Sequence, residues 1–385
     1  MTAHAPLPPS GAACWVKCAQ WPAMNKLYGG GDTPESLEGR VAHHVLAEAI
    51  QGRWLTACTL VQASDTGEML AVTDDMLEGA AVFVADLHAT VPEGWAEVVV
   101  GADMRNSVIV PGVLYVECMW GASPFIHPDC WGTPDVLLRR ADRSTIVWDY
   151  KYGHRKVEAV GNWQCAAYLA PLAMTAPPQV RIVQPRNYEA GAPVRVWSPT
   201  AIELEGMWED LRLAAKAAMG SPRDATVGEQ CRYCPGRHAC GPLQAAGNTW
   251  ADFAASTATV QELPPTHAGR EMRYLAEAIA TLEARRSGLE AVVTSAYRRG
   301  ERGLGWAIER AAGRRVWTAS VEQIEGVGMM AGKLLLKPPA PVTPTQAIAA
   351  GIPADLVESM SERKPGGEKL VIDTETKARK AFFEE

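Results

Sequence analysis

Three charged residues between positions 135 and 151 have types and a spacing that suit metal-assisted cleavage of a phosphodiester bond. Asp149 and Lys151 stand in the run VWDYKY, and Asp135 follows a proline in GTPDVLLRR. Side chains alternate between the two faces of a strand, so Asp149 and Lys151 share one face. Paired carboxylates can hold divalent cations, and a nearby lysine can lower the pKa of a metal-bound water or stabilise charge at phosphorus. The other interpretation is an ion pair on a half-exposed strand.

A hairpin must position these side chains. The segments TPDVLLRRA and STIVWDYKY read as strands with turn residues between them, so Asp135 and Asp149 are expected at the same edge of the pair. Two earlier segments, AEVVVGADM and GVLYVECMW, also read as strands. Glu117, in the second of these, is either a further carboxylate of the site or a solvated strand residue.

Helical patterns surround the strands. EGRVAHHVLAEAIQGR has apolar residues at positions 41, 45, 46 and 49, which form one helical face. NWQCAAYLAPLAM and AIELEGMWEDLRLAAKAAMGS read as further helices, and VRIVQPR and VRVWSP as short strands. This order predicts an α/β domain, which we place at residues 1–245. A C-terminal extension at 246–385 is expected to be mostly helical, with some mixed structure.

The composition is that of an ordinary soluble protein of two to three domains, with 385 residues, 47% of them hydrophobic and 21% charged. The N-terminus lacks the pattern of a secretory signal, and the longest apolar stretch, CAAYLAPLAMTAPP, is shorter than the roughly 18 residues of a membrane span. We therefore expect a cytoplasmic protein without a membrane partner. The net charge of −7 argues against simple charge-driven binding of nucleic acid, although basic residues gather around 283–303 and near the C-terminus.

Three cysteines form a compact pattern near the end of the predicted domain. Cys231, Cys234 and Cys240 have C-x2-C-x5-C spacing, which in a chain without a secretory signal indicates a metal site rather than disulfides. His238 could supply the fourth ligand of a Zn2+ site.

Four pieces of sequence together resemble the PD-(D/E)xK nucleases. The proline and Asp135, followed by Asp149 and Lys151, are similar to the signature itself. The flanking motifs resemble the RecB-like branch, which includes the AddB-like and the CRISPR adaptation nucleases. Its G-x-x-x-H motif is matched by GRVAH, which ends at His43, with His44 directly after it as the other choice. Its Q-x-x-x-Y motif is matched by Gln164 and Tyr168 in NWQCAAYLA.

This resemblance implies a restriction-endonuclease-like core, in which a mixed central sheet is flanked by helices. It implies that Lys151 assists the attacking water and that Gln164 and Tyr168 contact DNA. Glu117 and His44 are further candidates near the metal. The ligands of Mg2+ or Mn2+ implied by the resemblance are His43, Asp135, Asp149 and the carbonyl of Tyr150.

The resemblance extends to the iron-sulfur members of the branch. In these nucleases the same cysteine spacing follows the nuclease motifs, and a fourth cysteine comes from an N-terminal helix. CWVKCAQW supplies Cys18 for this position, with Cys14 as a substitute. A 4Fe-4S cluster would then hold the two ends of the domain together, with Zn2+ as the alternative metal. Its implied ligands are Cys18, Cys231, Cys234 and Cys240.

The remainder of the chain resembles a family of phage-encoded RecB-like proteins. The similarity rests on QPR at 184–186, the long helix at 268–300, GRRVW and the ending KPGGEKLVIDTETKARKAF. It implies an exonuclease that acts on DNA ends in phage recombination, in the cytoplasm of a phage-infected or prophage-carrying bacterium. A single-strand annealing or single-strand-binding protein is the expected partner. A structure-specific or nicking endonuclease and a non-catalytic DNA-binding scaffold are the rival functions, and the oligomeric state stays open.

Overall fold

The computed structural model describes most of the chain, which divides into two compact units, Met1–Arg286 and Ser287–Glu385. The division falls within the long helix α8 (Pro265–Arg298), so residues 246–286 group with the first unit rather than with the second. The described residues are 5–31, 33–64, 67–121, 125–172, 176–187, 193–221, 223–255, 264–310, 315–333, 335–337, 340–341, 344–349, 351–363 and 368–372.

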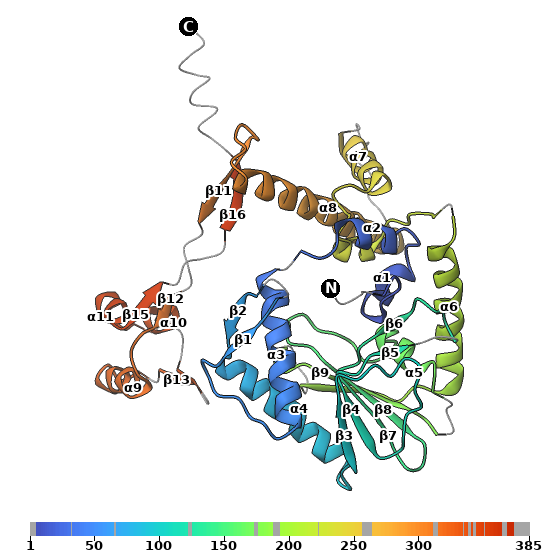
Figure 1. Ribbon diagram of the computed structural model, residues 1–385. Helices are drawn as coiled ribbons and strands as arrows, with labels where there is room; N and C mark the ends of the chain where they lie inside the picture. Colours follow the sequence, from blue (N-terminus) through green and yellow to red (C-terminus); the bar gives the residue numbers. More distant parts are fainter. Residues whose placement is uncertain are drawn as a thin grey trace. The chain divides into compact units, whose positions relative to one another are not determined.

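A six-stranded mixed sheet forms the centre of the first unit, in the order β10-β9-β8-β7-β4-β3 (Figure 1). Strands β3 and β4 pair in parallel, as do β8 and β9, and the other neighbours are antiparallel. This arrangement confirms the predicted fold class, a mixed central sheet flanked by helices. The strands are β3 (Glu97–Val100), β4 (Val113–Val116), β7 (Val136–Arg139), β8 (Thr145–Tyr150), β9 (Gln179–Val183) and β10 (Val194–Trp197).

Helices cover both faces of the sheet, which explains why β8 is buried along its whole length (Figure 1). α3 (Pro34–Ile50) and α4 (Asp74–Thr90) pack on one face, where Trp148 and Tyr150 lie in the core. α5 (Trp163–Leu169) and α6 (Ala201–Met219) pack on the other face, where Val147 lies. Strands buried on both sides are rich in β-branched and aromatic residues, as TIVWDY is apart from Asp149.

The helix that carries His43 follows directly from its sequence. Thr33 and Ser36 form a capping box before the first turn of α3, and a proline occupies its first position. The predicted apolar face is confirmed, because the residues at 41, 45, 46 and 49 are all buried. That face fixes the rotation of the helix. α4, which the sequence patterns did not predict, packs along α3 with Phe83 fully buried.

Smaller elements complete the first unit. Two short hairpins accompany the sheet, and no described helix is long and apolar enough to cross a membrane. The elements are η1 (Pro9–Gly11), α1 (Ala12–Trp15), α2 (Trp21–Tyr28), β1 (Leu60–Gln62), β2 (Met69–Ala71), β5 (Trp120–Gly121), β6 (Trp131–Gly132), η2 (Glu229–Tyr233) and α7 (Gly241–Ala255).

The second unit combines short helices and two-stranded sheets around a small core of its own, to which Ile324, Val327 and Val357 belong. The first two residues of GRRVW and most of the ending KPGGEKLVIDTETKARKAF lie outside the described residues. Its elements are β11 (Trp306–Arg310), β12 (Arg315–Trp317), α9 (Val321–Met330), β13 (Leu336–Lys337), β14 (Ala340–Pro341), α10 (Pro344–Ala349), α11 (Ala354–Ser359), β15 (Ser361–Arg363) and β16 (Glu368–Ile372).

Candidate functional site

The hairpin of β7 and β8 brings the two predicted aspartates together. Val136 pairs with Trp148, so Asp135 and Asp149 stand opposite each other one step further along the antiparallel pair. Both side chains belong to buried residues, with 8% of Asp135 and 2% of Asp149 exposed. Asp135 Oδ2 accepts a hydrogen bond from the main-chain N–H of Tyr150 at 2.5 Å, which leaves Oδ1 for other partners.

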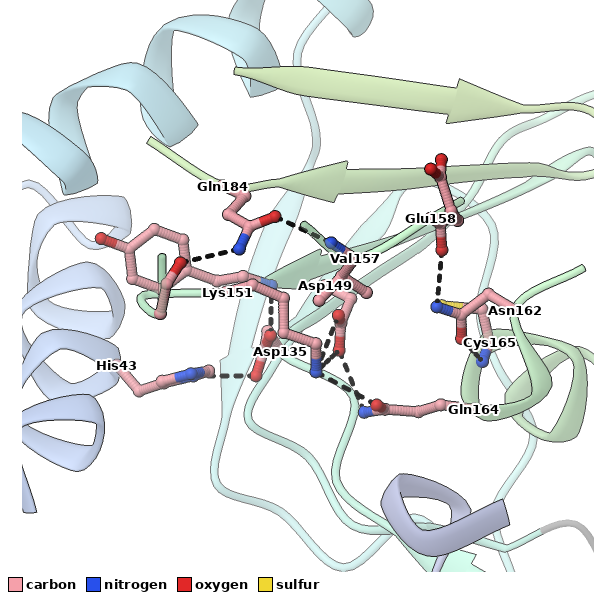
Figure 2. Close-up of polar contacts among 12 residues, drawn as sticks. His43, Asp135, Asp149, Lys151, Val157, Glu158, Asn162, Gln164, Cys165 and Gln184 are labelled. Carbon is pink, nitrogen blue, oxygen red and sulfur yellow. Dashed lines mark hydrogen bonds and ion pairs between the residues drawn. The ribbon is translucent and has the colours of Figure 1, made fainter. Parts of the chain in front are cut away.

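Asp135 Oδ1 lies in a group of three donors. His43 Nδ1, from α3, is 3.0 Å from Asp135 Oδ1 and 3.5 Å from Glu117 Oε1 (Figure 2 shows the first contact). One donor atom from each of the three residues lies within 4.8 Å of the others. A histidine nitrogen with two carboxylate oxygens is a donor set that suits Mn2+ and, through its oxygens, Mg2+. The residues therefore fit the divalent cation that the sequence predicts.

Glu117 enters this group through an unusual main-chain conformation. Its φ is +49°, in the left-handed region, directly after the end of β4. A non-glycine residue there costs about 1–3 kcal/mol, which the surrounding structure must offset. The N–H of Glu117 donates to the carbonyl of Asp135 at 3.0 Å, and this bond ties the bend to the neighbouring strand. The bend directs the carboxylate toward His43, so Glu117 is no ordinary solvated strand residue.

Charge in the three-donor group is tightly coupled. Burial favours neutral His43, but the charge of Asp135 and hydrogen bonds to Asp135 and Glu117 outweigh it and raise the pKa of His43 to about 10. Burial also opposes ionisation of Asp135, yet His43 and Lys151 hold its pKa below the usual value. Burial raises the pKa of Glu117. Without a metal, a proton on His43 balances the carboxylates, and a bound cation would take over that role.

Asp149 and Lys151 form a second group beside the first. Lys151 Nζ lies 3.0 Å from Asp149 Oδ1 and 2.9 Å from Oδ2, and donates to Gln164 Oε1 at 3.1 Å. Gln164 Nε2 in turn donates to Asp149 Oδ1 at 3.0 Å, so the three side chains close a ring of contacts (Figure 2). Burial would lower the pKa of Lys151, but Asp149 and Asp135 raise it above the usual value. Lys151 is therefore a fixed cation.

The structure distinguishes between several predicted residues. His43 reaches the site, whereas the adjacent His44 is exposed and interacts with Glu48 on α3. Tyr168 is only 3% exposed, and its hydroxyl forms a hydrogen bond with the side chain of Gln164. Tyr168 therefore contacts Gln164 from the protein interior. Direct contact of Gln164 and Tyr168 with DNA stays a prediction.

Tyr150 supports the site from the core side of the sheet. Its buried ring packs edge-on against the ring of His43, with centroids 5.4 Å apart, and against Phe83 at 5.8 Å. Space for its hydroxyl depends on Gly79 of α4, because a Cβ there would overlap the Tyr150 oxygen. The role of the Tyr150 carbonyl as a ligand stays a prediction.

The four predicted cysteine ligands line one pocket. Its walls come from residues 18–24 and from residues 225–243, so the pocket joins segments from both ends of the predicted domain. The apolar part of the lining includes Trp21, Met24 and Leu243. Lys17 and Glu229 form an ion pair between the same two segments. Lining the pocket are Cys18, Cys231, Cys234 and Cys240.

The alternatives for the fourth ligand lie outside the pocket lining. The ring of His238 packs edge-on against Tyr28 at 4.7 Å, and burial raises the pKa of the Cys14 thiol to about 11. Burial likewise raises the pKa of Cys234 to about 11. Among the described residues, no three of the cysteine sulfurs lie within 4.8 Å of one another. Every described cysteine is free of disulfide bonds.

The sequence motifs predict no role for Gln184 and Arg186 beyond their place in QPR. Gln184 is 1% exposed and contacts the segment that follows Lys151 (Figure 2). A glutamine at the end of the apolar run VRIV was the available signal, since a buried amide needs several partners.

The chain belongs to the family described as "Protein of unknown function (DUF2800)", whose model matches residues 4–375. A crystal structure from Eubacterium rectale described as "Putative exonuclease" is similar to the chain, with a TM-score of 0.34 and 10% sequence identity. That match covers 67% of this chain and 90% of the other. None of the curated proteins matches the sequence.

Proposed function

We propose that this protein is a divalent-metal-dependent deoxyribonuclease. The observation that carries the proposal is the pairing of two groups at one edge of the sheet: the donors His43, Glu117 and Asp135, and beside them the cation Lys151 held by Asp149. A metal position next to a fixed positive charge suits the cleavage of a phosphodiester, where negative charge grows on the oxygens around phosphorus.

We assign each residue a role that its contacts or the sequence resemblance support. His43, Glu117 and Asp135 would hold Mg2+ or Mn2+, with Asp149 and the Tyr150 carbonyl as further ligands. When bound, the cation supplies an activated water and stabilises the leaving oxygen. Lys151 stays charged and stabilises the phosphate in the transition state. Gln164 bonds both Lys151 and Asp149 and so fixes their direction toward the substrate.

We further propose an exonuclease that acts on DNA ends, in phage recombination beside a single-strand annealing or single-strand-binding protein. The support for this finer function is the sequence resemblance to phage-encoded RecB-like proteins. A structure-specific or nicking endonuclease would use the same groups, and the difference is one of access to the strand rather than of chemistry.

The cysteine pocket is proposed to hold a 4Fe-4S cluster. Four thiols with apolar neighbours suit such a cluster. Zn2+ bound by the same thiolates is the alternative, because a tetrahedral zinc site also takes four cysteine ligands.

The decisive experiment is digestion of end-labelled linear DNA and covalently closed circular DNA with Mg2+ or Mn2+. Wild type is compared with Lys151→Ala and with the control Lys216→Ala, which changes an exposed lysine in the last turn of α6. We expect Lys151→Ala to lose about 100-fold or more of the cleavage rate and the control to lose little. Loss of linear DNA alone would identify an exonuclease, and cutting of the circle an endonuclease. Absence of cleavage by metal-loaded wild type would refute the proposal.

A further inference from the structure

The segment after Lys151 is held by a buried glutamine. Residues 151–162 contain neither helix nor strand, so their main-chain groups need other partners. Gln184 Nε2 donates to the carbonyls of Gly153, at 2.7 Å, and Arg155, at 2.6 Å. Its Oε1 accepts from the N–H of Val157 at 3.0 Å. One amide side chain thus fixes three points of a five-residue stretch, and Figure 2 shows its contact with Val157.

Arg195, on β10, reinforces this contact. Its Nη2 donates to Gln184 Oε1, and its Nε donates to the carbonyl of Val157 at 2.7 Å. Immediately before this stretch, the N–H of Lys151 donates to the carbonyl of Val183 at 2.9 Å. Lys151 is therefore held by residue 183 at its own main chain, and the segment that continues from it is held by Gln184.

Arg186 connects the same segment to the helix of His43. Its Nη1 lies 3.0 Å from Glu38 Oε1, on α3 five residues before His43. Its guanidinium lies 4.4 Å from the centre of the Tyr152 ring, the residue after Lys151. Its Nη2 is 2.9 Å from Nε2 of His154. Only 17% of the Arg186 side chain is exposed, which strengthens these contacts relative to a surface pair.

We propose that Gln184 and Arg186, together called the QPR clamp, are positioning residues of the active site. Neither touches the metal donors. Gln184 sets the path of the chain that leaves Lys151, and Arg186 fixes the distance between that chain and the helix that carries His43. This inference rests on the proposed function for its catalytic readout, whereas its metal-binding readout is independent of cleavage.

The two residues act on different partners, so their loss has different signatures. In Arg186→Met, α3 loses its ion pair through Glu38. We expect Mn2+ to bind about 10-fold more weakly, because loss of a group that orients a metal ligand typically weakens metal binding by about that factor. In Gln184→Met, which is close in size, we expect kcat at saturating Mn2+ and DNA to fall about 10-fold. Its Mn2+ affinity and KM should stay within about twofold of wild type, because His43 is unaffected.

The matched control is Arg181→Met on β9. Arg181 forms a buried ion pair with Asp86, so its loss should lower stability without changing Mn2+ affinity or kcat of the folded protein. Arg186→Lys keeps the charge opposite Glu38 but loses the planar contact with Tyr152, and should lie between wild type and Arg186→Met in Mn2+ affinity. Where Arg186→Met does not fold, this lysine variant carries the test.

Mn2+ binding is measured by calorimetry on folded protein, and kcat and KM by digestion of labelled DNA. The positioning role of the QPR clamp would be refuted if both Arg186 variants bound Mn2+ as tightly as wild type. It would also be refuted if Arg181→Met and Arg186→Met weakened Mn2+ binding equally. If wild type binds Mn2+ but cuts no DNA, the proposed nuclease function is refuted. The Mn2+ affinities of the Arg186 variants would still test whether Arg186 positions the metal ligands.

Discussion

The proton on His43 gives the metal site a defined dependence on pH. With the pKa of His43 raised to about 10 by Asp135 and Glu117, the metal-free site is protonated at neutral pH. A cation bound to this nitrogen must displace the proton. One displaced proton makes the affinity rise about tenfold, or about 1.4 kcal/mol, for each pH unit below the pKa. Between pH 7 and pH 9, Mn2+ should therefore bind about 100-fold more tightly, with little further gain above pH 10.

Calorimetry at pH 7, 8 and 9, in buffers of different ionisation enthalpy, measures both the affinity and the number of protons released. His43→Ala should bind weakly and lose the steep pH dependence, whereas the control His44→Ala should retain it. An affinity independent of pH in wild type, or the same slope in His43→Ala, would refute the reasoning.

The same pKa shift predicts a loss of stability in the metal-free protein. His43 has a higher pKa when folded than when unfolded, so the stabilisation from its proton is fully present below about pH 6.5 and is lost as the pH rises toward 10. Thermal unfolding with a chelator should show a Tm that falls across this window, and saturating Mn2+ should reduce the fall. A Tm that rises over the window in wild type but not in His43→Ala would contradict the assignment.

Three further outcomes are expected. Anaerobically purified wild type should be brown and contain iron and sulfide. Cys234→Ser should lose the brown colour and have a lower Tm, whereas the control Cys58→Ser, at an exposed cysteine, should keep the colour and the wild-type Tm. Zinc without iron in the wild-type protein would reject the cluster. Gly79→Ala should destabilise the fold by about 1–3 kcal/mol, because its Cβ would overlap the hydroxyl of Tyr150, and denaturant unfolding measures the change. Phe83→Ala should cost about 3–5 kcal/mol in the same assay, and a cost below about 1 kcal/mol would mean that α4 is not packed as described.

Local rules were sufficient to predict the sheet and the hairpin. The alternation in VWDYKY placed Trp148 and Tyr150 in one core and left Asp149 and Lys151 on the other face, because strand geometry has a fixed period of two. The apolar positions of the first long helix likewise predicted which side of α3 is buried. Both results depend on neighbours along the chain, which a sequence displays directly.

The parts that could not be predicted depend on contacts between distant segments. The choice of His43 over His44 depends on the rotation of α3 against the sheet. The position of the Glu117 carboxylate depends on the left-handed main-chain conformation of Glu117 itself. The sequence does not indicate this conformation, because the residue is neither glycine nor asparagine. Gln184 looked like the end of an apolar strand, and its role became visible only once the loop at 153–157 lay beside it.

The ion pair of Lys17 with Glu229 joins residues separated by 212 positions along the chain. Closing a loop of this length costs on the order of 5 kcal/mol of chain entropy, which contacts made after closure must offset. The segment that carries Lys17 can therefore pair with Glu229 only after the sheet strands between them in the sequence have been synthesised. Docking of α1 and α2 is expected to be a late folding event. A metal bound by cysteines from both the Lys17 segment and the Glu229 segment could bind only after that docking.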